Sequence, residues 1–216
     1  MDVSVTLAII VITCLVSIPA FSNQRMIDDL IFYPPAIAQQ NQWYRFITCG
    51  FIHGDWIHLA FNMYAFYGFG LTIELTLAEA FGGVTGRLLF IFLYITSLFF
   101  CLIPTYIKHK DNYYYRSLGA SGAVSAIVFA YMLLNPTGGI GIIFLPFSLP
   151  AFVLGPVYLI ITSVLSRKGG SNINHSAHFW GAIYGMVFII AAFYFLKGIN
   201  VPAYFIDQVR SYLGAL

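Results

Sequence analysis

Charged residues are scarce in this chain. Of its 216 residues only 8% carry a charge, while 60% are hydrophobic, whereas a soluble domain has roughly 25% charged and 45–50% apolar residues. This composition excludes a soluble globular protein, because water is not the solvent for most of the surface. A transmembrane helix needs about 20 mostly apolar residues, so the chain can cross a bilayer several times. We expect residues 1–216 to form one membrane-embedded domain.

A basic cluster, a cysteine framework and a signal peptide are also missing. The net charge is only +2 and the basic residues are scattered, which argues against a nucleic-acid partner. Cys14, Cys49 and Cys101 share no spacing with one another or with histidine that would predict a metal site. The N-terminus lacks the basic segment of a secretory signal peptide, so the first apolar stretch is expected to remain as a span.

Apolar stretches, in contrast, recur along the whole chain. The sequence predicts an all-α fold, a bundle of six transmembrane helices with a membrane-associated first loop. The predicted spans cover about residues 4–21, 57–78, 88–107, 118–135, 149–166 and 176–196.

The loops between these spans differ in character. The first loop, residues 22–56, mixes apolar runs with Pro34, Pro35, Trp43 and Tyr44, a composition typical of a segment in the headgroup region. The later loops are a turn with Gly82, Gly83 and Gly86, a polar loop with Lys108 and Arg116, a charge-free Gly/Pro linker at 136–148 and a short loop at 167–174.

The orientation in the membrane is ambiguous from charge. Six spans put both termini on one side. If that side is the cytoplasm, the outside loops hold seven basic residues and the inside holds three, which contradicts the positive-inside rule. Charge alone therefore places the N-terminus outside. The seven are Arg25, Arg45, Lys108, Lys110, Arg116, Arg167 and Lys168, and the three are Arg87, Lys197 and Arg210.

Polar side chains within the predicted spans mark candidate functional sites, because they are costly in a bilayer. The second span carries His58 and Asn62, the fourth carries Ser121, and the sixth carries His178. These three spans run in the same direction, and each holds its polar group near its N-terminal end. The groups are therefore expected at a similar depth, about one turn below the same surface.

Small residues would allow the fourth and sixth spans to approach each other closely. This approach would bring the histidine of the sixth span towards the serine of the fourth. A serine hydroxyl becomes a nucleophile when an adjacent base takes its proton, and histidine is the usual partner. The small residues are Gly119 and Gly122 on the fourth span and Gly181 and Gly185 on the sixth.

No acid is placed to complete a triad. Glu74 follows Asn62 by twelve residues, which is about 18 Å along a helix, and Asp55 and Asp111 lie in loops. A dyad of serine and histidine is therefore preferred. His58 and Asn62 offer N–H groups, as does the free backbone at the start of the fourth span, and together these predict an oxyanion hole.

Each of these residues also has a less specific interpretation. A serine among small residues is more often a packing residue, and lone histidines are mostly structural or pore-lining. Asn62 could simply bond a neighbouring helix. His53 is interpreted as structural, with a supporting hydrogen bond, and Arg45 and Glu74 as loop and helix-end anchors. The shared depth of the polar groups is what favours a catalytic site.

Taken together, the motifs resemble those of the rhomboid family of intramembrane serine proteases, from about residue 43 to 186. The matching motifs follow the family's order: Trp43-Tyr44-Arg45, His53 with His58-Leu-Ala-Phe-Asn62, Gly70 to Glu74, Gly119-Ala-Ser121-Gly122, and His178-Phe-Trp-Gly181-Ala-Ile-Tyr-Gly185. The resemblance implies cleavage of single-span membrane proteins within or next to their transmembrane helix, in the lipid bilayer. It also implies that no metal, ATP or other cofactor takes part.

The family's pattern further implies a role for each motif residue. Ser121 would be the nucleophile, His178 the general base, and His58 and Asn62 the oxyanion donors. The fifth span and the loop at 167–174 would gate substrate access. Bacterial relatives have a cytoplasmic N-terminus, which conflicts with the charge count, and the expected location is a bacterial inner membrane.

The sequence departs from the family's pattern at Ser125, and two alternative functions must be weighed against a protease. Ser125 stands where some members carry an aromatic residue that packs on the histidine. An inactive relative that binds membrane proteins would have lost the serine or the histidine, whereas both are present. A transporter or channel predicts polar residues along the full depth, whereas here they cluster at one end. A serine endopeptidase is preferred over both.

Overall fold

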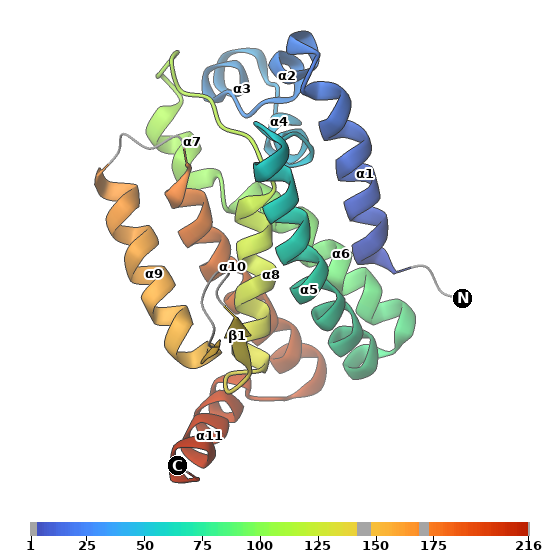
Figure 1. The fold of residues 1–216 in the computed structure, drawn as a ribbon, viewed down its shortest axis with the longest axis vertical. Coiled ribbons are helices and arrows are strands. Elements are labelled where there is room, and N and C mark those ends of the chain that lie inside the picture. Colours follow the sequence, from blue (N-terminus) through green and yellow to red (C-terminus); the bar gives the residue numbers. More distant parts are fainter. Residues whose placement is uncertain (1–3, 142–147, 169–172, 216) are drawn as a thin grey trace.

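The computed structural model describes residues 4–141, 148–168 and 173–215. Figure 1 shows a bundle of long helices with short helices over one end and a further helix at the other. The bundle contains α1 (Val5–Ala20), α5 (Trp56–Phe81), α6 (Gly83–Phe100), α8 (Ser121–Leu134), α9 (Ala151–Lys168) and α10 (His175–Lys197). The end with the short helices holds α2 (Gln24–Leu30), α3 (Pro34–Gln40), α4 (Arg45–Thr48), the 3-10 helix η1 (Cys49–Phe51) and α7 (Ile103–His109), and α11 (Val201–Gly214) lies at the opposite end.

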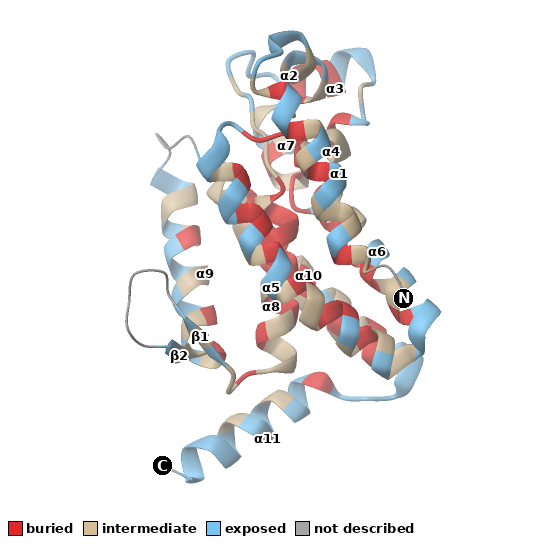
Figure 2. Cartoon of the chain, turned by 45° about the vertical axis from the view of Figure 1, so that its right-hand side comes forward, coloured by how far each residue is buried: buried red, intermediate tan, exposed pale blue. Residues whose placement is uncertain are grey.

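Helix α8 lies at the centre of this bundle. It contacts α5, α6, α9 and α10, and α10 is its most extensive partner. Its sequence is apolar or small on every face, as expected for a helix surrounded by protein. Figure 2 shows that buried residues gather in the middle of the bundle. Ile127 of α8 packs there in the same cluster as Phe66, Phe90 and Tyr94.

Glycines bring the backbones of α8 and α10 into contact. A Cβ atom on Gly181 would lie 2.0 Å from the carbonyl oxygen of Gly122, and one on Gly185 would lie 2.1 Å from the carbonyl oxygen of Ala126. No side chain fits in either place. The two helices therefore meet at the small-residue face where the sequence predicts a close approach.

Glu74 of α5 anchors the start of α1. Its carboxylate accepts hydrogen bonds from the backbone N–H groups of Val5 and Thr6 and from the hydroxyls of Ser4 and Thr6, each 2.8 Å long. These N–H groups belong to the first turn of α1 and have no partner within the helix. The carboxylate satisfies them in a buried place, at the end of the bundle opposite the short helices.

The predicted third span, 88–107, lies within the apolar segment Gly83–His109, which a turn divides into two helices. Helix α6 begins earlier and ends at Phe100, and α7 begins at Ile103 after a turn. Pro104 explains the break, since proline lacks an N–H and its ring clashes with the carbonyl four residues earlier. The turn before α6 is also shorter than predicted. Gly82, with φ +86°, is the one residue between α5 and α6, and Gly86 lies within the helix.

The fold is also not purely α-helical. In the linker predicted at 136–148, β1 (Gly139–Gly141) pairs antiparallel with β2 (Ser148–Pro150), which extends into the start of the predicted fifth span, 149–166. Residues 142–147 of that linker, and 169–172 of the loop predicted at 167–174, lie outside the described residues.

Several helices are apolar enough for a bilayer. Within the described ranges, three segments combine sufficient length and hydropathy to span a membrane: Gly83–His109, Ala151–Lys168 and His175–Lys197. Helices α1 and α8 are apolar but shorter. These helices indicate an integral membrane protein, while the count of six spans stays a prediction.

Candidate active site

Ser121 and His178 contact each other directly. Ser121 is the first residue of α8, and His178 lies in the first turn of α10. The Ser121 Oγ and the His178 Nε2 are 2.6 Å apart, and both side chains are half-buried. With its proton on Nδ1, the imidazole accepts the serine hydroxyl proton at Nε2. This is the geometry that a general base and a nucleophile require.

Asn174 fixes the start of the helix that carries the histidine. As the N-cap of α10, its Oδ1 accepts a hydrogen bond from the Ala177 N–H at 3.0 Å. The same side chain contacts the Thr105 hydroxyl of α7 at 3.2 Å and the Ser117 hydroxyl at 3.5 Å. The first turn of α10 is thereby tied to the segment that precedes the nucleophile.

The segment before Ser121, residues 117–120, is held by the first loop. Ser117 and Phe32 exchange backbone hydrogen bonds of 3.0 and 3.1 Å, and the Gly119 N–H donates to the Cys49 carbonyl at 2.9 Å. Arg45, which is buried, supports the loop by donating from Nη1 to the carbonyls of Asp28 and Ile31, each at 2.8 Å. The first loop therefore supports the segment that leads into Ser121.

His53 joins this support to α1. The Ala120 N–H donates to the His53 Nε2 at 3.4 Å, and the His53 Nδ1 lies 2.8 Å from the Ser17 Oγ, whose hydroxyl donates to the Phe51 carbonyl at 2.9 Å. This pattern requires a neutral imidazole that carries its proton on Nδ1. Ser17 is a buried residue of α1, so that helix also contributes to holding the nucleophile.

The neutral state of His53 predicts a pH dependence of stability. Burial, with a smaller effect of His58, lowers the pKa of His53 from its ordinary 6.5 to about 3. Between these values the unfolded chain binds a proton that the folded protein excludes, so stability falls as the pH falls. We expect the thermal unfolding midpoint in detergent to fall between pH 7 and pH 4.5, and to fall clearly less in His53→Gln, which does not titrate. An equal fall in both proteins would contradict this account.

His58 packs against the glycine that precedes the nucleophile. A Cβ atom on Gly119 would lie 2.7 Å from the His58 Cε1 and 2.8 Å from its Nε2, and Gly119 has φ +107°. The Gly54 N–H approaches the His58 Nδ1 at 3.4 Å, which leaves Nε2 to carry a proton as a donor. Only glycine at 119 therefore permits both the backbone turn and this position of the ring.

Asn62 lies one turn further along α5 and is buried. Its Nδ2 donates to the carbonyl of His58 at 2.9 Å, which leaves one N–H of the amide for another acceptor. Asn62 and His58 line the same cleft as Ser121 and His178. The structure thus brings the four predicted residues to one cleft, although within the described residues neither Asn62 nor His58 hydrogen-bonds to Ser121.

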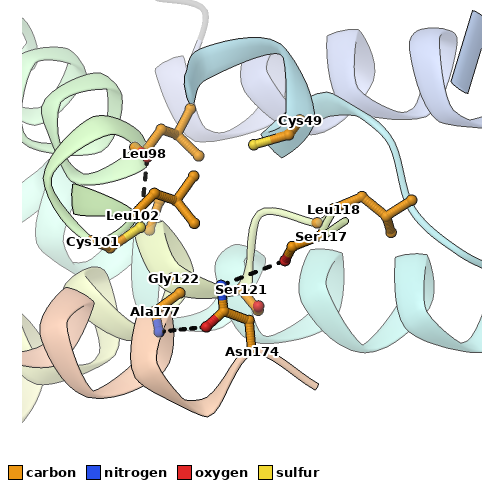
Figure 3. Close-up of a pocket in the computed structure, with 12 residues that line it drawn as sticks. Cys49, Leu98, Cys101, Leu102, Ser117, Leu118, Ser121, Gly122, Asn174 and Ala177 are labelled. Atoms are coloured by element: carbon orange, nitrogen blue, oxygen red, sulfur yellow. Dashed lines mark hydrogen bonds between the residues drawn. The ribbon is translucent and has the colours of Figure 1, made fainter. Parts of the chain in front are cut away.

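A small cavity adjoins the cleft at Ser121, which lines both. Figure 3 shows its walls, which include the Ser117 hydroxyl, the Asn174 amide and the thiols of Cys49 and Cys101. The first backbone N–H groups of α8 also lack intrahelical partners, because its N-cap Ala120 provides no side-chain acceptor. Within the described part of the chain, Ser121 therefore lies beside backbone N–H groups that have no partner in the helix, as stabilisation of an oxyanion requires.

Ser125 and Tyr158 connect α8 to α9 one turn below the nucleophile. The Ser125 Oγ and the Tyr158 hydroxyl are 3.0 Å apart, and the tyrosine ring packs on Phe129 at 5.4 Å between ring centroids. Both hydrogen-bonded residues line the cleft. The aromatic residue at this level thus comes from α9, and not from position 125, four residues after Ser121.

Several supporting residues were not identified from the sequence. Asn174 had a detectable signal, since asparagine is a preferred N-cap directly before a helix. Ser17, Ser117 and Tyr158 had none, because their partners are distant in the chain. Ser17 and His53, for example, are in contact although they lie 36 positions apart in the sequence.

Comparisons with known proteins identify the family of this chain. The sequence model of the Rhomboid domain matches residues 40–195. The chain is 28% identical over 141 residues to the human presenilin-associated rhomboid-like protein, mitochondrial, covering 64% of this chain and 35% of that protein. It is 32% identical over 158 residues to the Arabidopsis thaliana RHOMBOID-like protein 12, mitochondrial, covering 63% and 42%.

A bacterial relative matches over a larger share of its length. YdcA of Bacillus subtilis, named as a candidate rhomboid protease, is 28% identical over 173 residues, or 79% of this chain and 77% of that protein. The chain spans only 35% to 42% of the mitochondrial relatives above. The fold and the site define a helical integral membrane protein with a serine-histidine pair. The chain belongs to the rhomboid family, as its motifs predicted.

Proposed function

We propose that this protein is an intramembrane serine endopeptidase that cleaves single-span membrane proteins within or next to their transmembrane helix. The observation that carries the proposal is the 2.6 Å contact between the Ser121 Oγ and the His178 Nε2, in a cleft within an apolar helical bundle. Family membership and the relative named as a candidate protease support it.

In the proposed reaction, Ser121 attacks the scissile carbonyl while His178 takes its proton at Nε2. The negative charge that forms on the carbonyl oxygen is stabilised by N–H groups of His58, Asn62 and the start of α8. His178 then returns the proton to the leaving amine. A water molecule, deprotonated by the same imidazole, releases the acyl group from Ser121 and restores the pair.

The proposed topology has six spans: α1, α5, the segment from α6 into α7, α8, α9 and α10. We place the N-terminus in the cytoplasm and the protein in a bacterial inner membrane, as the family pattern implies. Helix α9 is the proposed gate, because few of its residues are buried and it borders the cleft. The hydrogen bond between Ser125 and Tyr158, which lies near the middle of α9, would then hold this gate closed.

The experiment that tests the function is a cleavage assay in liposomes. The purified protein would be reconstituted with labelled single-span proteins, and the products identified by mass. Cleavage at a defined bond within or next to the transmembrane helix is expected. The alternative function is an inactive scaffold that binds membrane proteins, and stable substrate binding by well-folded protein without any cleavage would favour it.

A further inference from the structure

The mouth of the active-site cleft carries positive charge. Lys108 of α7, Arg116 of the following loop and Arg167 of α9 line it, together with His109 and His175. These elements converge at the end of the bundle with the short helices (Figure 1). Among the described residues that line the cleft, Asp55 is the only acidic one, and its Oδ1 accepts the His58 N–H at 2.7 Å. The mouth is therefore basic, and few acidic side chains neutralise its positive charge.

Two of these cations have no partner in the part of the chain that the structure describes. Arg116 pairs with Asp28 at 3.0 Å, yet half of its side chain stays exposed. Lys108 and Arg167 are exposed and form no ion pair there. Unpaired cations on two walls of one opening create a local positive potential, which attracts acidic groups.

The position of these charges distinguishes them from ordinary solvated side chains. A polypeptide bound across Ser121 must leave the protein through the mouth of the same cleft, because the dyad lies within it. The segment of a substrate that emerges there passes between Lys108 and Arg167. Their position also accounts for part of the basic excess at this end, which contradicts the positive-inside rule if the N-terminus is cytoplasmic.

We propose that the basic mouth, defined as Lys108, Arg116 and Arg167, selects membrane proteins with acidic residues directly outside the transmembrane helix on the active-site side. The inference rests on the proposed function for the kind of ligand, a single-span membrane protein. Acidic residues in that segment pair with the unpartnered cations and raise affinity and the rate of association. Basic residues at the same place are repelled.

The test measures binding without cleavage. Ser121→Ala protein in nanodiscs of zwitterionic lipid would be titrated with three labelled single-span peptides, which share one transmembrane helix and differ in an acidic, neutral or basic flanking segment. We expect the acidic peptide to bind about tenfold more tightly than the basic one, since several exposed pairs each contribute modestly. High salt should reduce the difference.

Charge variants locate the effect. In the same background, Lys108→Gln with Arg167→Gln should remove most of the preference, and Lys108→Glu with Arg167→Glu should reverse it. Lys197→Glu, at the opposite end of α10, is the matched control and should keep the wild-type order. Equal affinities for the three peptides, or an unchanged order in the charge-reversed variant, would overturn the proposal.

Two other outcomes are distinguishable from these. A second set of nanodiscs would contain a labelled anionic lipid, phosphatidylglycerol. If the double variants bind less of that lipid while the order of the peptides is unchanged, the basic mouth binds a lipid headgroup and the proposal is wrong. Because the readout uses a protein that lacks the serine hydroxyl, failure of the wild type to cleave would refute the proposed protease function alone. The order of the three peptide affinities would still show whether the basic mouth prefers an acidic flanking segment.

Discussion

Replacement of Ser121 by alanine is expected to abolish cleavage of single-span substrates, with a loss of about 10,000-fold or more in kcat. Among the described residues, the Ser121 hydroxyl is the nucleophilic group that His178 contacts, at 2.6 Å. His178→Ala should lose as much, and the double variant little more, because the two residues act as a unit. The measurement is the initial rate in liposomes at saturating substrate.

Ser176→Ala is the matched control for this loss. Ser176 lies two residues before the base and lines the same cleft, without being part of the dyad. Its removal should leave the rate within a few-fold of wild type. Substantial cleavage by Ser121→Ala would mean that another residue attacks the substrate, and the account of the site would be wrong.

Gly181→Ala is expected to have the second largest effect. The added Cβ atom would lie 2.0 Å from the Gly122 carbonyl oxygen, and because this atom belongs to the backbone, α8 and α10 must separate. His178 lies on α10 with Gly181, and Ser121 directly precedes Gly122 on α8, so separation of the helices moves the base away from the serine. We expect about 100-fold lower activity, because misplacement of about 1 Å can cost this much, and a lower thermal unfolding midpoint.

Gly68→Ala is the control for this substitution. Gly68 also lies within a helix, but nothing lies within 4 Å of an added Cβ atom there. Alanine has the higher helix propensity, so this variant should be as stable as wild type or slightly more stable. Wild-type activity and stability in Gly181→Ala would contradict the close packing of α8 on α10.

The helices and the contact of Ser121 with His178 could be predicted from the sequence because both depend on short-range patterns. The sixth apolar stretch, expected at 176–196, is α10 over His175–Lys197. The second, fourth and sixth predicted spans run in the same direction, and each has its polar group near its start, so these groups were expected at one depth. The glycines indicated that the fourth and sixth spans meet. The spacing of small residues within each helix thus predicted a contact between two helices that are distant in the sequence.

The supporting contacts could not be predicted in this way. The contact of Ser125 with Tyr158 depends on how α9 leans on α8, and that of Ser17 with His53 depends on where α1 meets the first loop. Neither packing has a sequence pattern of its own. The break after Phe100 was missed although Pro104 is visible, because the apolar run continues through it.

Labelling with a serine-reactive fluorophosphonate tests the central claim most directly. The purified protein would be labelled in detergent, digested, and mapped by mass spectrometry, beside Ser121→Ala and His178→Ala. A single adduct on Ser121, absent from both variants, is the predicted result, because it requires a hydroxyl activated by this histidine. A well-folded wild type that takes no label, or that carries the label on another serine, would contradict the account.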